Sequence, residues 1–130
     1  MTPHMPTGTT TRRILRMALA RGGLTINPYT GEEPDTGYVV GCHKDHEVWS
    51  TSTAQLDAST LHEYIRANAD LLSNGEHLGI WLDKGETWLD VVKVVDDLPI
   101  ALVLAKEHNQ QAIYDLENRE VIWMKEKDAS

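Results

Sequence analysis

A long β-hairpin is the feature of this chain that most restricts how it can fold. Ile80–Asp83 and Thr87–Val95 are rich in β-branched and aromatic residues, and the Lys-Gly pair between them is typical of a two-residue turn. Such a turn aligns Trp81 with Trp88 across the two strands. We therefore expect a hairpin that carries its two indoles side by side.

The two faces of this hairpin differ in their side chains. Because side chains alternate along a strand, Trp81 and Trp88 share a face with Asp90, Val92 and Val94. Neither face is purely polar, so the second strand is predicted to lie in the middle of a sheet. The opposite face carries Leu89, Val91, Lys93 and Val95.

Two segments upstream have the apolar period of an amphipathic helix. Residues 12–21 form a short helix with Thr11 as its cap. Residues 58–72 form the clearest helix of the chain, capped by Asp57 or Thr60. A helix of about ten residues is marginal alone, so we expect the first one to dock on the body of the protein.

A third helical segment, residues 98–108, is apolar on nearly every side. Pro99 lies in its first turn, where a missing N–H has no cost. A helix that is hydrophobic all round is buried on two sides. We expect either the N-terminal helix or a second copy of the chain to cover its outer side, which makes Ile100, Val103 and Leu104 candidates for an interaction surface.

The remaining segments complete the predicted order of elements. Residues 24–37 are full of turn signals, and residues 38–42 read as a strand with 48–51 as its returning partner. Residues 112–115 and 121–124 form a last hairpin. The order α-ββ-α-ββ-α-ββ predicts an α+β domain with a mostly antiparallel sheet and helices packed on one face.

The chain of 130 residues is long enough for one domain. We predict a flexible arm over 1–11, a single domain over 12–124 and a polar tail over 125–130. The net charge of −8 is uneven, because residues 1–23 contain four arginines and no acid, so that the rest carries −12. The candidate basic contact consists of Arg12, Arg13, Arg16 and Arg21.

Charge and composition restrict the partners that this protein can have. An acidic body disfavours binding to nucleic acid, which needs clustered basic residues. No apolar run approaches the ~20 residues of a membrane span. The only cysteine, Cys42, excludes an intramolecular disulfide and favours a cytoplasmic protein. We expect a protein partner or a homodimer, and no small molecule is evident.

Residues 42–46 form the densest cluster of potential metal ligands in the chain, with Cys42, His43, Asp45 and His46. Zinc prefers thiolate and imidazole ligands that converge on one point. Neighbouring side chains of a strand point to opposite faces, so Cys42 and His43 do not converge without distortion. A polar turn explains the cluster better, and we predict neither a metal nor a nucleophilic cysteine here.

Asp90 is the most notable carboxylate because it interrupts an apolar strand. A buried carboxylate needs hydrogen bonds or a shifted pKa. One interpretation joins Asp90 with Tyr114 and Asp115 in a small polar site, and the other places Asp90 at the sheet rim, bonded to a turn or an arginine. We favour the second interpretation.

Three tryptophans, Trp81, Trp88 and Trp123, are predicted to share one sheet face. Exposed, they would form a platform for a protein or for stacked bases. Covered, they would form the core of a protein that contains no Phe. We expect the second arrangement.

Two stretches, residues 22–41 and 88–122, resemble small uncharacterised proteins of actinobacterial phages, plasmids and integrated elements. In that group a Leu-Asp-Val strand, here residues 89–91, precedes a helix that ends in Asn-Gln, here 109–110. A strand of the Ala-Ile-x-Asp type follows at 112–115. The resemblance covers about 55 of the 130 residues and implies an accessory protein of a mobile element, without a specific activity.

Three functional hypotheses follow. The first is a non-catalytic binding protein that acts through protein contacts, such as an inhibitor of a basic nuclease or toxin, or a DNA mimic. The second is an enzyme of unrecognised type, with the polar site described above and one of His62, His77 or His108. The third is nucleic-acid binding through the basic helix. No phosphate loop, dinucleotide fingerprint or nucleophile elbow is present, so we expect no catalysis and no cofactor.

Overall fold

The computed structural model describes residues 4–41 and 49–124. These ranges form an α+β fold with one antiparallel sheet of seven strands. The elements are α1 (Gly8–Arg21), β1 (Gly23–Ile26), β2 (Tyr38–Gly41), β3 (Trp49–Ser52), the 3-10 helix η2 (Thr53–Gln55), α2 (Ala58–Ala67), α3 (Ala69–Leu72), β4 (His77–Asp83), β5 (Glu86–Val95), α4 (Leu98–Glu107), β6 (Ala112–Asp115) and β7 (Glu120–Trp123).

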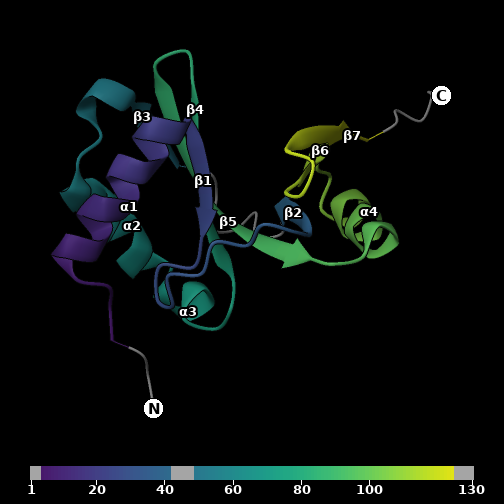
Figure 1. Ribbon diagram of the computed structural model, residues 1–130, viewed down its shortest axis with the longest axis horizontal. Coiled ribbons are helices and arrows are strands. Elements are labelled where there is room, and N and C mark those ends of the chain that lie inside the picture. Colours follow the sequence, from purple (N-terminus) through teal and green to yellow (C-terminus); the bar gives the residue numbers. More distant parts are fainter. Residues whose placement is uncertain (1–3, 42–48, 125–130) are drawn as a thin grey trace.

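The long strand β5 lies at the centre of the sheet, and three strands pair with it. β4 runs along one edge of β5, and the other edge is divided between β3 and β2. The path through the sheet is β1-β4-β5-β2-β6-β7, with β3 beside β5. Figure 1 shows β5 passing from the half of the molecule that holds α1 and α2 to the half that holds α4.

The predicted hairpin is confirmed residue by residue. Trp81 is the partner of Trp88, and Asp83 is the partner of Glu86 across the two-residue turn. Lys84 and Gly85 have φ angles of 52° and 83°, the left-handed values that such a turn requires. The turn therefore sets which side chains of β5 face each side of the sheet.

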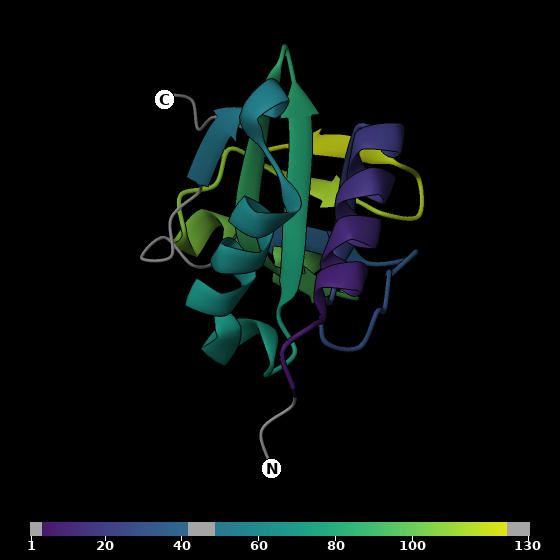
Figure 2. The ribbon, with the colours of Figure 1, turned by 90° about the vertical axis from the view of Figure 1, so that its left-hand side faces the viewer.

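The helices lie against one face of the sheet, as the order of elements predicted. Leu89 and Val91 of β5 point to this face, and both are buried together with residues of α1 and α2. Alternation along β5 places Lys93 on the same face, and its partner on β2, Val40, is buried against α4. Figure 2 shows α1 and α2 in front of β4 and β5.

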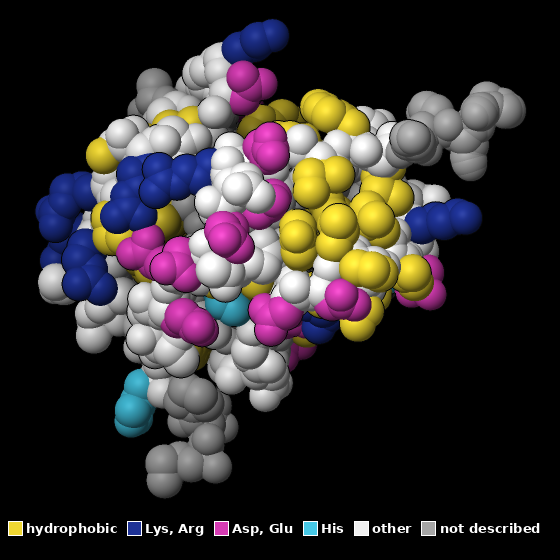
Figure 3. Space-filling model, turned by 45° about the vertical axis from the view of Figure 1, so that its right-hand side comes forward, with side chains coloured by type: hydrophobic (Ala, Val, Ile, Leu, Met, Phe, Trp, Pro, Cys, Tyr) yellow, Lys and Arg dark blue, Asp and Glu magenta, His cyan; other side chains and the backbone are white. Residues whose placement is uncertain are grey.

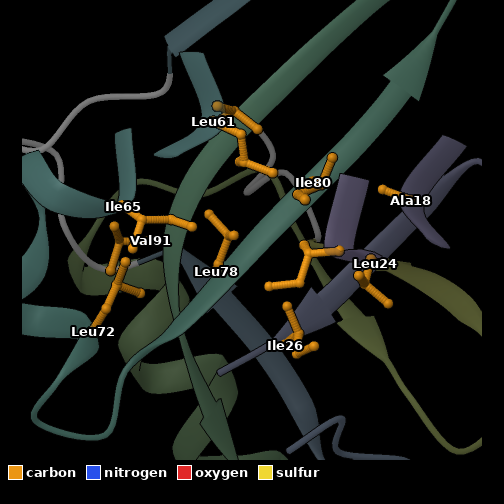
Figure 4. Close-up of a cluster of buried hydrophobic side chains, with 11 residues drawn as sticks. Ala18, Leu24, Ile26, Leu61, Ile65, Leu72, Leu78, Ile80 and Val91 are labelled. Carbon is orange, nitrogen blue, oxygen red and sulfur yellow. The ribbon is translucent and has the colours of Figure 1, made fainter. Parts of the chain in front are cut away.

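Two hydrophobic clusters stabilise the two halves. The larger one joins α1, α2, β1, β4 and β5, and Figure 4 shows its side chains converging between the helices and the sheet. The smaller one joins α4 to β2 and β6 through Val40, Ala101, Ala105 and Ile113. The sheet curls between the two clusters, and no helix of the described residues packs on its other face.

Several element boundaries differ from those predicted. The N-terminal helix begins at Gly8, so the predicted arm over 1–11 is wrong from that residue onward. Thr7 caps the helix, because its side chain accepts a hydrogen bond from the N–H of Thr10 at 3.1 Å. Thr11, predicted as the cap, is buried, and its hydroxyl donates to the Thr7 carbonyl. The sequence 8–11 has no apolar period, so this turn escaped the prediction.

The predicted loop over 24–37 contains strand β1. This strand has four residues, too few for periodicity to reveal, and it obtains its hydrogen-bond partners from β4. The predicted hairpin between residues 38–42 and 48–51 is also wrong. β2 and β3 both pair with β5 instead of with each other.

The predicted helix over 58–72 is interrupted at Asn68. The side-chain amide of Asn68 donates a hydrogen bond to the carbonyl of Tyr64 at 2.9 Å. This bond competes with the backbone hydrogen bonds of the helix and lies where α2 ends and α3 begins. Asp57, one of the two caps that we predicted, caps α2, because its side chain accepts a hydrogen bond from the N–H of Thr60 at 2.8 Å.

Within the described ranges, no helix has the length and apolar content needed to cross a membrane. The predicted tail over 125–130 lies outside the described residues.

We predict that Ile80→Ala lowers the free energy of unfolding by about 2–5 kcal/mol, because Ile80 is completely buried in the larger cluster. Ile100→Ala is the matched control, since Ile100 is 52% exposed, and its cost is expected below about 0.5 kcal/mol. Urea unfolding followed by tryptophan fluorescence measures both. Similar costs for the two variants would contradict the burial of the β4 face.

Candidate functional site

The helix-free face of the curled sheet is concave and holds the candidate site. Trp81 of β4 and Tyr114 of β6 point into it, although two strands separate β4 from β6 in the sheet. Their ring centroids are 5.5 Å apart with an interplanar angle of 74°, an edge-to-face contact. The curl of the sheet therefore brings these two rings together.

Glycines make room on this concave face. Gly79 is the partner of Asp90, and a Cβ at Gly79 would lie 3.5 Å from Nε1 of Trp81. A Cβ at Gly41 would lie only 2.8 Å from the side-chain oxygen of Gln110. Glycine inside a strand commonly marks a close approach of other groups, and here it allows larger side chains to lie over the strands.

Two hollows open on either side of the Trp81–Tyr114 pair. The inner hollow, of about 220 Å³, is mainly apolar and contains Asp90 and Gln110. The outer hollow, of about 790 Å³, has charged residues at its rim. Its lining consists of Arg21, Gly22, Gly23, Leu24, Thr25, Glu33, Pro34, Asp35, Trp81, Tyr114, Leu116 and Arg119.

The loop after β1 is held in place by a buried asparagine. The side-chain oxygen of Asn27 accepts from the N–H groups of Tyr29 and Thr30, and its amide donates to the carbonyl of Glu76 at 3.3 Å. Glu33, further along this loop, accepts a 2.6 Å hydrogen bond from Arg21 at the end of α1. These contacts place an ion pair at the rim of the outer hollow.

The polar site of Asp90, Tyr114 and Asp115, the interpretation that we did not favour, is only partly assembled. Asp90 and Tyr114 line the same inner hollow. Asp115 points to the opposite face, where its carboxylate accepts hydrogen bonds from the side chain and N–H of Asn118 and from the N–H of Glu117. These bonds lower the pKa of Asp115 and assign it to the β6–β7 turn.

Asp90 also acts electrostatically on α2. Burial raises the pKa of the Tyr64 hydroxyl, and the negative charge of Asp90 raises it further. Tyr64 therefore remains protonated at physiological pH. The negative charge of Asp90 thus raises the pKa of Tyr64, a residue outside the hollow that Asp90 lines.

None of the three histidines considered for catalysis lines either hollow. His62 of α2 lies 3.3 Å from the hydroxyl of Thr11, and His108 ends α4. His77 is 9% exposed, and its Nε2 lies 3.7 Å from a carboxylate oxygen of Glu32. Burial lowers the pKa of His77, and the charges of Glu32 and Glu76 oppose this effect.

The tryptophans do not form a shared core. The register places Trp81, Trp88 and Trp123 on the concave side, but Trp88 and Trp123 are 40% and 70% exposed. The expectation that these two are covered is therefore wrong. Both lie on the face of the sheet against which the described helices do not pack. Of these three tryptophans, Trp81 alone lines the hollows.

The outer side of α4 is uncovered among the described residues. Ala101 and Ala105 face the sheet, whereas Ile100 and Val103 are 52% and 57% exposed and Leu104 is partly buried. The N-terminal helix, one of the two predicted covers, packs instead on α2, β1 and β4. Figure 3 shows hydrophobic side chains gathered on the side of the molecule that carries α4, with acidic side chains along their border.

The four arginines of the predicted basic contact lie on α1 and are exposed. Arg21 forms the ion pair with Glu33, and Arg12 donates to the hydroxyl of Thr9 at 3.3 Å. Arg13 and Arg16 face solvent on the same helix. The structure thus keeps these charges together on one helix, although Arg21 is paired with an acid.

The polar segment with Cys42, His43, Asp45 and His46 lies outside the described residues. Across residues 4–41 and 49–124, no group of three or more His, Cys, Asp or Glu side chains is arranged to hold a metal ion.

Comparisons with protein-family models, with curated proteins and with solved structures found no match to this chain. The resemblance to proteins of mobile elements therefore stays a prediction.

Some residues at this site were not predicted from the sequence. Arg119 lies in a turn, Glu33 and Asp35 lie in an irregular loop, and only the fold brings them to the outer hollow. Gly41 and Gly79 carried a usable signal, since each interrupts a strand pattern.

We predict that the free energy of unfolding falls as the pH is lowered from 7.5 to 5, in part because of His77. Its pKa is depressed in the folded state, so the unfolded chain binds more protons once the pH drops below about 6.5. His77→Leu removes this titration and should flatten the profile above pH 5. Chemical denaturation at a series of pH values measures it. An unchanged slope in the variant would contradict the assignment, and His4→Leu, at an exposed position, is the control.

Proposed function

We propose that this protein is a non-catalytic binding protein that acts through protein contacts made by the outer face of α4. The observation that carries the proposal is the exposure of Ile100 and Val103 in the middle of a helix with acids at both ends. Exposed apolar patches rimmed by polar residues are typical of interaction sites. The partner that fits this surface is a protein with an apolar patch flanked by lysine or arginine.

The geometry of α4 places these groups in one stripe. Residues three and four apart lie on the same side of a helix, so Val103 is a neighbour of both Ile100 and Glu107. Asp96 and Asp97 are exposed just before the first turn. Lys106 is three residues from Val103 and therefore also lies beside it. The stripe is apolar in its centre and acidic at its N-terminal end, and its C-terminal end carries one base and one acid.

Charge favours a basic partner over a second copy of this chain. A two-fold pair of parallel α4 helices would place Asp96 and Asp97 near the same two aspartates of a second copy. Like charges at such distances are repulsive. The net charge of −8 also attracts basic proteins over long distances.

The concave site gives less support to an enzyme. The inner hollow joins one carboxylate, Asp90, to a tyrosine and a tryptophan, and the outer hollow contains Asp35 and Glu33, which is paired with Arg21. Among the described residues, no histidine or serine lines either hollow. A general acid–base pair or an activated nucleophile needs a second titratable group within hydrogen-bond distance. A protein that is encoded by a mobile element and inhibits or modulates a basic protein accords with the apolar stripe and with the net charge of −8.

We predict that a labelled amphipathic peptide, with an apolar centre flanked by lysines, binds the wild-type protein and binds Val103→Ser about tenfold more weakly. The substitution exchanges an exposed apolar contact for a hydroxyl at the centre of the stripe. Glu107→Gln should weaken binding less and reduce its dependence on salt. Fluorescence anisotropy at two salt concentrations measures both.

The controls separate this surface from general acidity. Leu19→Ser, on α1, removes another exposed apolar side chain, and Asp70→Asn removes a charge from α3. Both should bind the peptide as the wild type does. Equal binding of a glutamate-flanked peptide would overturn the proposal. Light scattering that shows a dimer dissociated by Val103→Ser would assign the surface to a second copy of the chain instead.

A further inference from the structure

We propose that the open edge of strand β1, inside the outer hollow, is a binding site for an extended peptide that adds to the sheet as a further strand. The site lies on the concave face, away from the outer face of α4. It is therefore separate from the contact surface proposed above. The inference combines the backbone groups of this edge with the rings and charges of the hollow.

The register of the sheet determines where the backbone groups of β1 point. The N–H of Leu82 in β4 donates to the carbonyl of Gly22 at 3.3 Å. Because hydrogen-bonded pairs alternate along an antiparallel ladder, Leu24 also bonds to β4. The N–H and C=O groups of Gly23 and Thr25 therefore point away from β4, to the open edge of the strand.

These groups lack a hydrogen-bond partner in the part of the chain that the structure describes. Farther along the edge, the N–H of Asn27 donates to the carbonyl of Glu32 at 2.9 Å, so the loop after β1 covers the edge only from there onward. Thr25 is 8% exposed, and buried N–H and C=O groups need partners. An open strand edge is a template for pairing with another chain.

The outer hollow runs along this edge. Four successive residues of the chain, 22–25, line it, although the side chain of Leu24 belongs to the larger cluster on the other face. A cavity over one face of a strand meets alternate side chains, whereas a cavity along its edge meets successive residues. The volume of about 790 Å³ lies within the roughly 300–1,000 Å³ that is typical of ligand sites.

The spacing of the open groups selects a peptide as the ligand. Gly23 and Thr25 are two residues apart, so their groups repeat about every 6.8 Å along the strand. An extended peptide presents N–H and C=O groups at the same interval, which is the basis of recognition by strand addition. A second folded copy of this chain does not fit, because the loop at 33–35 and the turn at 116–119 stand beside the edge.

Aromatic rings lie where the side chains of the peptide project. Thr25 is the partner of Gly79 and shares its concave face with Trp81. Trp81 and Tyr114 line the hollow in edge-to-face contact. A peptide side chain on this face lies toward the two rings, so the site favours an apolar residue there.

The charges of the hollow favour a peptide that carries both signs. Arg21 and Glu33 form an ion pair with each other at 2.6 Å. Arg119 and Asp35 are exposed and form no ion pair with any residue that the structure describes. A guanidinium binds a carboxylate through two parallel hydrogen bonds, and a carboxylate binds an ammonium group. These ligand charges come either from the termini of a free oligopeptide or from side chains within a protein segment.

The test uses the intact chain and end-capped hexapeptides of alternating valine and threonine, with lysine at one end and glutamate at the other, in both orders. Two N-methylated forms of each remove alternate N–H groups, on one edge of the peptide or on the other. We expect titration calorimetry to show at least tenfold weaker binding for one form and less than threefold for the other. Only one edge of the peptide faces β1, so the two forms differ.

Variants assign the binding to β1. Thr25→Pro removes the N–H that points into the hollow and keeps the pairing with β4, and proline is tolerated in edge strands at such positions. Thr25→Val is the matched control, because it removes the hydroxyl and keeps the N–H. We expect Thr25→Pro to weaken binding at least tenfold, whereas Thr25→Val and Val103→Ser, the latter on α4, should bind within threefold of the wild type.

Hydrogen exchange in the wild-type protein decides if Thr25→Pro does not fold. The amide hydrogens of Gly23 and Thr25 should exchange at least tenfold faster than those of Leu24 and Ile26, and the peptide should remove this difference. Tighter binding of an uncapped valine-threonine tetrapeptide supports a free oligopeptide as the ligand, and tighter binding of the capped hexapeptides supports a protein segment. Equal loss for both N-methylated forms, no binding of any peptide at millimolar concentration, or a slowly exchanging Thr25 amide in the free protein would overturn the proposal.

Discussion

Backbone pairing along β5 is the interaction on which this structure depends. The strand forms a ladder with β4 along one edge, while β3 and β2 occupy successive parts of the other edge. Buried N–H and C=O groups need partners, so a ten-residue strand in the middle of the sheet determines where its neighbours lie. Both hydrophobic clusters are built on this strand or on its direct partners, since Leu89 and Val91 belong to the first and Val95 packs against the second.

The concave face follows from the same arrangement. With all helices on one side, the other side of the sheet is left to side chains from the strands. Glycines at 41 and 79 reduce the bulk of that side and allow Trp81 to approach Tyr114 across two intervening strands. Architecture and candidate chemistry are therefore joined at one place, where Asp90 faces the space that these glycines leave open.

The features of the fold that could be predicted are those that short, regular patterns in the sequence determine. The hairpin register, the α+β class and the one-sided packing of the helices follow from alternation and from the turn at Lys84. β1 escaped because four residues show no period, and β3 was assigned the wrong partner because pairing between distant strands leaves no local signal. Asp90 and Tyr114 line one hollow, although we had favoured a place at the sheet rim for Asp90. Asp115 does not line it, since one residue of offset moves a side chain to the other face of a strand.

The divided edge of β5 has a consequence for motion. β3 pairs with residues 86–89 and β2 with residues 92–95, so on that edge neither strand pairs with residues 90 and 91. The half with α4, β6 and β7 is joined to the rest mainly through the end of this strand. Such a connection lets one part of a protein open while the other stays folded. We expect the amide hydrogens of α4 and β6 to exchange with solvent as one cooperative unit, ahead of those that lie beneath α1 and α2.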